Sequence, residues 1–139
     1  MKPIQLTKSG IILLFILFIA GCAKDSSTDP ATSDARSKFL GKWSVREPAT
    51  KGQNYEVTIT ADPSSSDGVY IDKFANAASG ISAFALIDGS TISLVKDEIL
   101  SNEWKVNGSG ILSGTKITWA YSLNTGADLQ NITATYTKE

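Results

Sequence analysis

The stretch Trp104–Leu123, WKVNGSGILSGTKITWAYSL, alternates apolar and polar residues on both sides of a Ser113-Gly114 pair. A period of two is typical of β-strands with one buried face, whereas an amphipathic helix repeats its apolar residues every 3.6 positions or so. Serine followed by glycine suits a tight hairpin turn. The segment therefore predicts two antiparallel strands, 103–112 and 115–123.

Two glycines interrupt the first of these strands on its apolar register. Gly108 and Gly110 leave no side chain at alternate inward positions. Interior glycines in a strand indicate a sharp bend or close packing beneath a large side chain. We expect Trp119, on the opposite strand, to fill that gap.

The same alternation extends along the rest of the chain from Phe39 onward, and turn residues separate the alternating runs. Asp88-Gly89 is a strong two-residue hairpin signal, while 62–68 and 124–128 read as longer loops. One short helical turn is expected, at Ala35–Leu40. The predicted strands are 42–47, 54–61, 69–74, 83–87, 90–95, 103–112, 115–123 and 130–138.

These eight hairpin-linked strands predict an all-β fold. An antiparallel up-and-down meander of this length pairs both of its edge strands by closing into a barrel. A two-layer β-sandwich of similar size is the alternative. The sequence alone leaves both open.

The N-terminal residues have another character. Lys2 and Lys8 flank the start of an uncharged apolar run, 11–20, which has the length of a signal-peptide core and is too short for a spanning helix. The residues Ile19-Ala20-Gly21-Cys22 follow. They resemble the lipobox of bacterial lipoproteins, which implies cleavage between Gly21 and Cys22 and acylation of the Cys22 thiol. Two or more acyl chains give durable membrane anchoring.

The resemblance divides the chain into a signal peptide (1–21), a lipidated tether (22–37) and a β domain (38–139). The tether is rich in Ser, Thr, Asp and Pro and has no large apolar residue, so we expect it to be disordered. Ala23 follows the cysteine in place of the aspartate associated with inner-membrane retention. The expected location is the outer membrane of the cell envelope, on either its periplasmic or its surface face.

The β domain resembles the lipocalins at its first strand. Gly41-Lys42-Trp43 after a helical turn is similar to their Gly-X-Trp signature, in which the tryptophan plugs one end of the barrel. The region from Trp104 to Lys138 is similar to small Gram-negative lipoproteins described as lipocalin-like. Lipocalins stack an arginine over the tryptophan, and here no arginine follows Arg46. The resemblance therefore assigns that role to Lys138 or Lys116.

The composition excludes several chemistries. The chain has no histidine and one cysteine, Cys22, so His-dependent triads, His/Cys zinc sites and an intrachain disulfide are excluded. Its net charge of −1 and the lack of a basic patch argue against nucleic-acid binding. We expect no enzyme activity, no cofactor and no metal. Most acidic side chains are expected on the solvated surface, among them Glu47, Glu56, Asp72, Asp88, Asp97, Glu98 and Glu103.

The aromatic residues leave two functions open. One is a non-catalytic barrel that binds a small hydrophobic ligand near the membrane. The other is a structural or accessory envelope protein with a filled barrel that acts through its outer surface. An eight-stranded barrel is just wide enough for either interior. The candidate ligand-binding residues are Tyr55, Phe84, Trp104, Trp119, Tyr121 and Tyr136.

Overall fold

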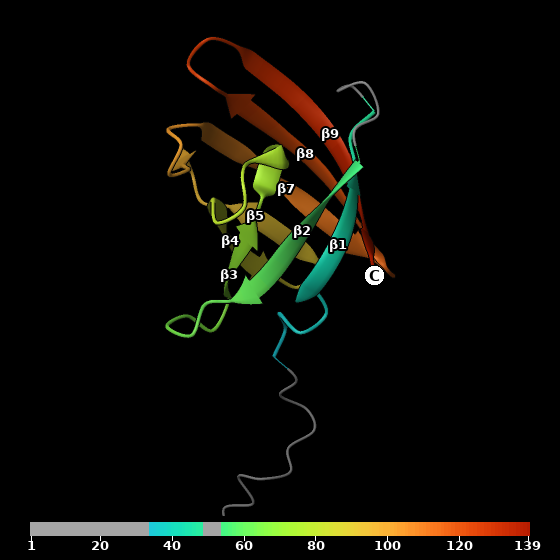
Figure 1. Cartoon of the computed structure of the whole chain (residues 1–139). Helices are drawn as coiled ribbons and strands as arrows, with labels where there is room; N and C mark the ends of the chain where they lie inside the picture. The colour runs from blue at the N-terminus through green and yellow to red at the C-terminus, as the bar shows by residue number, and fades with distance from the viewer. Residues whose placement is uncertain (1–33, 49–53) are drawn as a thin grey trace, which may run out of the picture. The chain divides into compact units, whose positions relative to one another are not determined.

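The computed structural model describes residues 34–48 and 54–139 (Figure 1). The predicted signal peptide, the cleavage site at Gly21 and Cys22, and the tether up to residue 33 lie outside the described residues. The elements are β1 (Gly41–Arg46), β2 (Asn54–Ala61), β3 (Gly68–Asp72), the 3-10 turn η1 (Phe74–Asn76), β4 (Ser82–Asp88), β5 (Thr91–Leu94), β6 (Glu98–Ile99), β7 (Lys105–Ser113), β8 (Lys116–Asn124) and β9 (Leu129–Lys138).

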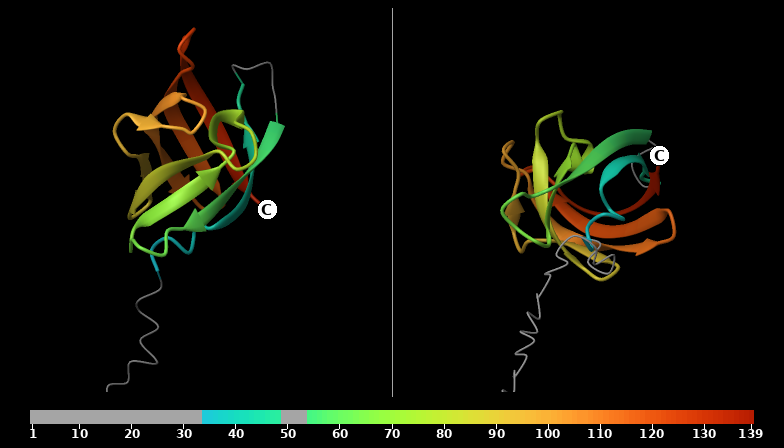
Figure 2. Two further views of the ribbon diagram at one scale, coloured as in Figure 1. Left: turned by 60° about the vertical axis from the view of Figure 1, so that its left-hand side comes forward. Right: turned by 90° about the horizontal axis from the view of Figure 1, so that it is seen from below.

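The strands form a closed barrel. Each of β1 to β4 pairs antiparallel with the next strand, β5 pairs with β7, and β7, β8 and β9 continue the sheet until β9 pairs with β1. Figure 2 shows these eight strands curving around one interior. The short β6 pairs with the end of β7 and is not part of the ring. The up-and-down barrel expected from the hairpin signals is therefore confirmed, and the sandwich alternative is wrong.

Alternate residues of every long strand point into the barrel. In β8, for example, Ile117, Trp119 and Tyr121 are buried while the residues between them are exposed. The inward residues of all strands make one continuous hydrophobic core, which Phe39 and Phe74 complete from outside the strands. This core lies within one compact unit, Thr32–Glu139, so the unit carries its own packing.

Gly110 and Trp119 are direct partners across the β7–β8 hairpin. A Cβ at Gly110 would lie 2.8 Å from Trp119 Cδ2 and 2.7 Å from Ile117 Cγ2. No heavier residue fits without displacing the indole, because real Cβ atoms do not approach neighbours so closely. The expectation that Trp119 fills the gap beneath the glycine is confirmed.

One end of the barrel, here called the base, is formed by the turn 35–40 and the adjacent strand ends. Trp43 is fully buried there, and its Nε1 donates to the carbonyl of Phe39 at 2.7 Å. Lys138 Nζ lies 5.4 Å from the centre of the Trp43 ring and donates to the carbonyl of Lys38 at 2.9 Å. Of the two lysines considered for the position over the tryptophan, Lys138 occupies it.

Arg36 fastens the same turn to the barrel. Its Nη1 donates to the carbonyls of Asp62, Ser65 and Gly68 at 2.9, 2.5 and 3.1 Å, while Nη2 pairs with Asp34 at 2.7 Å. The hydrogen bond from Arg36 lowers the pKa of the Asp34 carboxyl. Asp34 to Ser37 are thus part of the folded end, although they were assigned to the tether.

The expected short helical turn is present at residues 35–39, where the N–H groups of Phe39 and Leu40 both donate to the carbonyl of Arg36. Two local expectations differ from the structure: β6 is absent from the expected strands, and the third strand ends at Asp72, two residues before its expected end. The chain leaves β3 because Lys73, Ala75 and Asn76 adopt left-handed backbone conformations, which a strand cannot contain. Phe74 is consequently on a turn.

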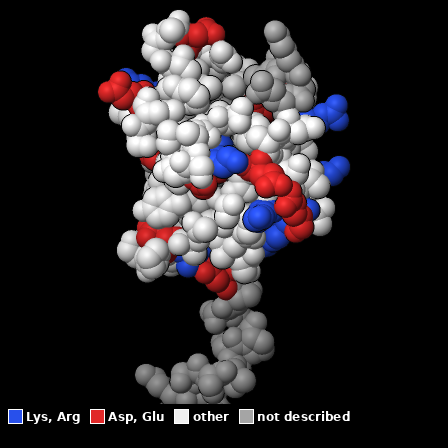
Figure 3. Space-filling model, viewed as in Figure 1, with Lys and Arg blue, Asp and Glu red and all other residues white. Residues whose placement is uncertain are grey.

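Lys and Arg side chains are interspersed with Asp and Glu on the face shown in Figure 3. Among residues 34–48 and 54–139, no helix has both the length and the apolar character needed to cross a membrane.

Candidate functional site

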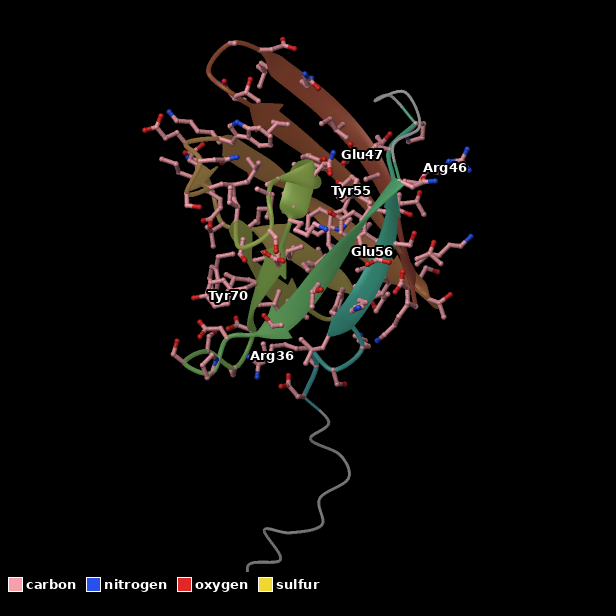
Figure 4. All side chains as sticks on the ribbon, viewed as in Figure 1. Arg36, Arg46, Glu47, Tyr55, Glu56 and Tyr70 are labelled. Carbon is pink, nitrogen blue, oxygen red and sulfur yellow. The ribbon has the colours of Figure 1, made fainter. Side chains whose placement is uncertain are left out.

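The end of the barrel opposite the base, here called the mouth, contains a buried carboxylate. Glu47 directly follows β1 and is 3 % exposed. Tyr55 and Tyr121 both donate their hydroxyls to Glu47 Oε1, the latter at 2.6 Å. Figure 4 shows Glu47 and Tyr55 together near this end of β1 and β2, with Arg46 and Glu56 directed away from the barrel.

Three tyrosines share this environment. Burial raises the pKa of Tyr55, Tyr121 and Tyr136 far above the ordinary value, and the negative charge of Glu47 adds to the rise for each of them. Tyr55 also adds to the rise at Tyr136, although the two hydroxyls do not meet the geometry of a hydrogen bond. All three phenols are therefore neutral hydrogen-bond donors at physiological pH.

Two buried polar atoms of the described residues have no hydrogen-bond partner: Trp119 Nε1 and Tyr136 Oη. Both side chains are completely buried, and their rings pack with centres 5.7 Å apart. An unsatisfied buried donor costs about 1–3 kcal/mol. Such atoms are rare in native interiors, and each calls for an explanation such as a bound water or ligand.

Phe74 packs against the ring of Trp119, one of the two side chains with an unpartnered donor. It belongs to η1, yet it is fully buried, and its ring centre lies 5.2 Å from that of Trp119 and 4.8 Å from that of Tyr121. The loop from Lys73 to Ile81 thus places a phenyl ring against the far wall of the barrel. The barrel is filled here by a loop side chain and not by a strand residue.

The backbone that carries Phe74 is strained. Lys73, Ala75 and Asn76 have φ values of 63°, 55° and 57°. Left-handed conformations cost non-glycine residues about 1–2 kcal/mol each, and less for asparagine. Burying a phenylalanine side chain contributes about 1.5–3 kcal/mol. The two terms are of similar size and opposite sign.

The structure places the candidate ligand-binding residues in three locations. Tyr55, Trp119, Tyr121 and Tyr136 come together in the interior around Glu47 and Phe74. Trp104 is half-buried just before β7 and only packs against the edge of the core.

Phe84 does not lie with them. It is on the outer face of β4, opposite Tyr70 of β3, with their ring centres 5.2 Å apart. The inward positions of β4 are the alanines on either side of it, Ala83 and Ala85. The inclusion of Phe84 among interior residues is wrong, because the run of apolar residues in Ala83–Ile87, AFALI, favours neither face.

Glu47 and Phe74 are the interior residues that the sequence analysis missed. Glu47 was expected at the surface, but it continues the inward parity of Trp43 and Val45, a signal available in the sequence. Phe74 carries no such signal, since it depends on how the loop after β3 folds back.

Two hollows are found elsewhere. One, of about 380 Å³, opens on the outer face of β7, β8 and β9 beside Asn107, Ser122 and Asn131. The other, of about 180 Å³, lies at the rim near Asp97, Lys105 and Asn124. Neither is lined by Trp119, Tyr136 or Phe74, so the buried donors are not exposed in them.

The arrangement brings hydrogen-bonding groups together in the barrel interior. It offers neutral phenols, an indole N–H and one carboxylate inside an aromatic enclosure. Within residues 34–48 and 54–139, no three carboxylate, cysteine or histidine side chains form a group that could hold a metal ion.

No family model and no curated protein matches this chain. Two solved structures are similar to it. One, described as a redesigned beta barrel, is 19% identical, with 76% of this chain and 96% of that chain covered and a TM-score of 0.49. The other, EF1p2_mFAP2b bound to DFHBI, is 16% identical, with 76% and 98% covered and a TM-score of 0.48.

The sheet topology itself defines the class of protein: a closed, eight-stranded, antiparallel β-barrel. More particularly, it is a barrel whose base is fastened by Arg36 and Trp43 and whose mouth holds a buried tyrosine–glutamate cluster beneath Phe74.

Proposed function

We propose that this protein is a non-catalytic, lipid-anchored barrel that binds a small ligand in the interior of its mouth. The observation that carries the binding proposal is the pair of buried, unpartnered donors, Trp119 Nε1 and Tyr136 Oη. The cost of desolvating these two atoms is already part of the folded state, so a ligand with hydrogen-bond acceptors satisfies them at no further desolvation cost to the protein.

The anchoring half of the proposal rests on the lipobox resemblance at Ile19-Ala20-Gly21-Cys22. It places the barrel at the outer membrane, on a tether between Cys22 and the turn fastened by Arg36. The lipocalin-like Gly41-Lys42-Trp43 corner, with Lys138 over the indole, supports the binding function by resemblance.

Native mass spectrometry of the protein purified from its own membranes tests both halves at once. We expect a mature chain that begins at Cys22 and carries acyl chains, together with an additional small-molecule mass that is lost at higher collision energy. A fully occupied apo signal would contradict the ligand. An unmodified Cys22 or a chain that starts upstream would contradict the anchor, as would unchanged palmitate labelling in Cys22→Ser.

The second candidate is a filled barrel that acts through its outer surface. The observation that favours it is the exposed apolar set on that face, in which Tyr70 (41%) and Leu86 (39%) adjoin Phe84 while Ile111 (61%) lies on β7. Cross-linking in intact cells separates the candidates: an envelope partner captured from the Tyr70 position supports this one, particularly if the purified barrel is apo.

A further inference from the structure

We infer that the Phe74 ring occupies the place of the ligand, and that the ligand is a small flat aromatic molecule with a hydrogen-bond acceptor, which enters as the loop 73–81 leaves. The inference rests on the proposed function and deepens it. It combines three features of the mouth: a loop-borne ring in the barrel interior, strained backbone on both sides of that ring, and unpartnered donors in the side chains around it.

The ring position sets the shape of the ligand. Phe74 makes an edge contact with Trp119, at 68° between the ring planes, and a tilted contact with Tyr121 at 55°. Aromatic rings prefer such arrangements over face-to-face stacking. A molecule that replaces Phe74 must present a flat ring to the same two walls to recover these contacts.

The orphan donors set its polarity. Trp119, one of the two walls, has an indole N–H with no acceptor, and the Tyr136 ring packs against the same indole. Phe74 has no acceptor to offer. A ligand ring that bears a carbonyl oxygen, an ether oxygen or an unprotonated nitrogen makes every contact of Phe74 and supplies the missing acceptor as well, so it competes favourably with that ring.

The hydrogen bonds of the loop lie within it. Lys73 N–H donates to the carbonyl of Ile81 at 2.9 Å, and Ala77 N–H donates to that of Phe74 at 3.1 Å. Neither bond ties Phe74 to the opposite wall of the barrel, and the Ala77 bond breaks when the 74–77 turn opens. Withdrawal also releases the left-handed conformations at Lys73 and Ala75, which lowers its cost.

Benzene and pyridine are suitable probes, because they share the shape of the Phe74 ring and differ by one acceptor. They are titrated by calorimetry, at a pH where pyridine is neutral, into the soluble chain 23–139, which contains the whole compact unit Thr32–Glu139. We expect Phe74→Ala to bind both probes at least about tenfold more tightly than the wild type, because the wild type must first expel its own ring. Phe84→Ala, which removes an outer-face ring, is the matched control and should bind both probes with the affinity of the wild type.

The ratio of the pyridine affinity to the benzene affinity tests whether the site prefers a ligand with a hydrogen-bond acceptor. The cost of desolvating pyridine is the same for every variant, so it cancels when the ratios of two variants are compared. In the Phe74→Ala background, replacing a donor with Tyr136→Phe or Trp119→Phe should reduce the preference for pyridine by about threefold or more for at least one donor. An unchanged affinity ratio in both double variants would contradict a ligand with a hydrogen-bond acceptor. Buried water would then be the partner of the two unpartnered donors. A ligand seen by native mass spectrometry with no gain in Phe74→Ala would overturn the exchange with Phe74 while the proposed function stands.

Loop opening is measurable without any cavity variant. In the wild type, the Ala77 amide should exchange its hydrogen with solvent at least about tenfold faster than the buried amides of β8, because it reports local opening and not global unfolding. Lys73→Gly removes the backbone strain of one left-handed residue in the closed loop. The closed loop should then be more stable, and exchange of the Ala77 amide should slow about fivefold. Glu103→Gly, the same kind of change at φ 67° in another loop, should leave it unchanged. Exchange of Ala77 at the β8 rate would refute the moving loop.

Discussion

Tyr121 and Glu47 are 74 residues apart in sequence, and the Tyr121 hydroxyl donates to Glu47 Oε1 at 2.6 Å inside the barrel. The bond joins the middle of β8 to the residue that directly follows β1. Tyr55 donates to the same oxygen from β2. The three side chains therefore cross-link both walls of the mouth, because the ring of strands places β1 between β2 and β9 and β9 beside β8.

Removing the charge at this centre should destabilise the barrel. Glu47→Gln keeps the size of the side chain but replaces charge-assisted hydrogen bonds from two phenols with weaker ones. We expect a loss of about 1–3 kcal/mol in the free energy of unfolding, measured by denaturant titration. When Glu47→Gln is made in the Tyr121→Phe background, the loss of unfolding free energy should be about 1 kcal/mol smaller. Fully additive effects would show that the 2.6 Å contact has no energetic role.

Stability should fall steeply in alkali. Burial raises the folded-state pKa of Tyr55, Tyr121 and Tyr136 above the unfolded value near 10. The three tyrosines therefore make their full contribution to the free energy of unfolding below about pH 10. Above that pH the contribution is lost, because only the unfolded chain releases the phenol protons. Each tyrosine adds about 1.4 kcal/mol per pH unit to the slope.

Phenolate absorbance followed through urea unfolding at several pH values measures that slope. Tyr121→Phe should lower it by about one proton. If the phenolates of the three buried tyrosines form in the native state near pH 10, the predicted linkage is absent.

Gly110 should tolerate no side chain. In Gly110→Ala the new methyl group would meet Trp119 and Ile117 at under 3 Å, so we expect about 1–3 kcal/mol of destabilisation from overpacking. Ser109→Ala, one position along on the exposed face, is the control and should change stability by less than about 0.5 kcal/mol. Equal melting temperatures for the two variants would mean that the indole can move aside.

The cation over Trp43 should contribute to the base. Lys138→Met keeps the apolar stem but removes the charge 5.4 Å from the ring and the hydrogen bond to Lys38. A loss of about 1 kcal/mol is expected in thermal unfolding monitored by tryptophan fluorescence. Lys138→Arg should retain stability, and Lys116→Met should have little effect. Unchanged stability in Lys138→Met would show that packing alone stabilises the Gly41-Lys42-Trp43 corner.

Much of the fold could be predicted because its signals are local. Alternation in β8 and β9, the Asp88-Gly89 turn and the glycines beside Trp119 are properties of residues within a few positions of one another or across a single hairpin. The candidate site was only partly predictable. Trp119, Tyr121 and Tyr136 lie on strands with clear parity, whereas Phe84 sits in a run that is apolar on both faces.

The sequence by itself determined which segments are strands, where the hairpins turn and why Gly110 is bare, since a strand's period and a turn's chemistry are fixed by neighbouring residues. Strand parity puts Glu47 on the inward register, but its enclosure and the entry of Phe74 into the barrel are properties of the folded chain. Both depend on closure of β9 onto β1 and on the course of the loop 73–81, and these are set by contacts between residues far apart in the chain.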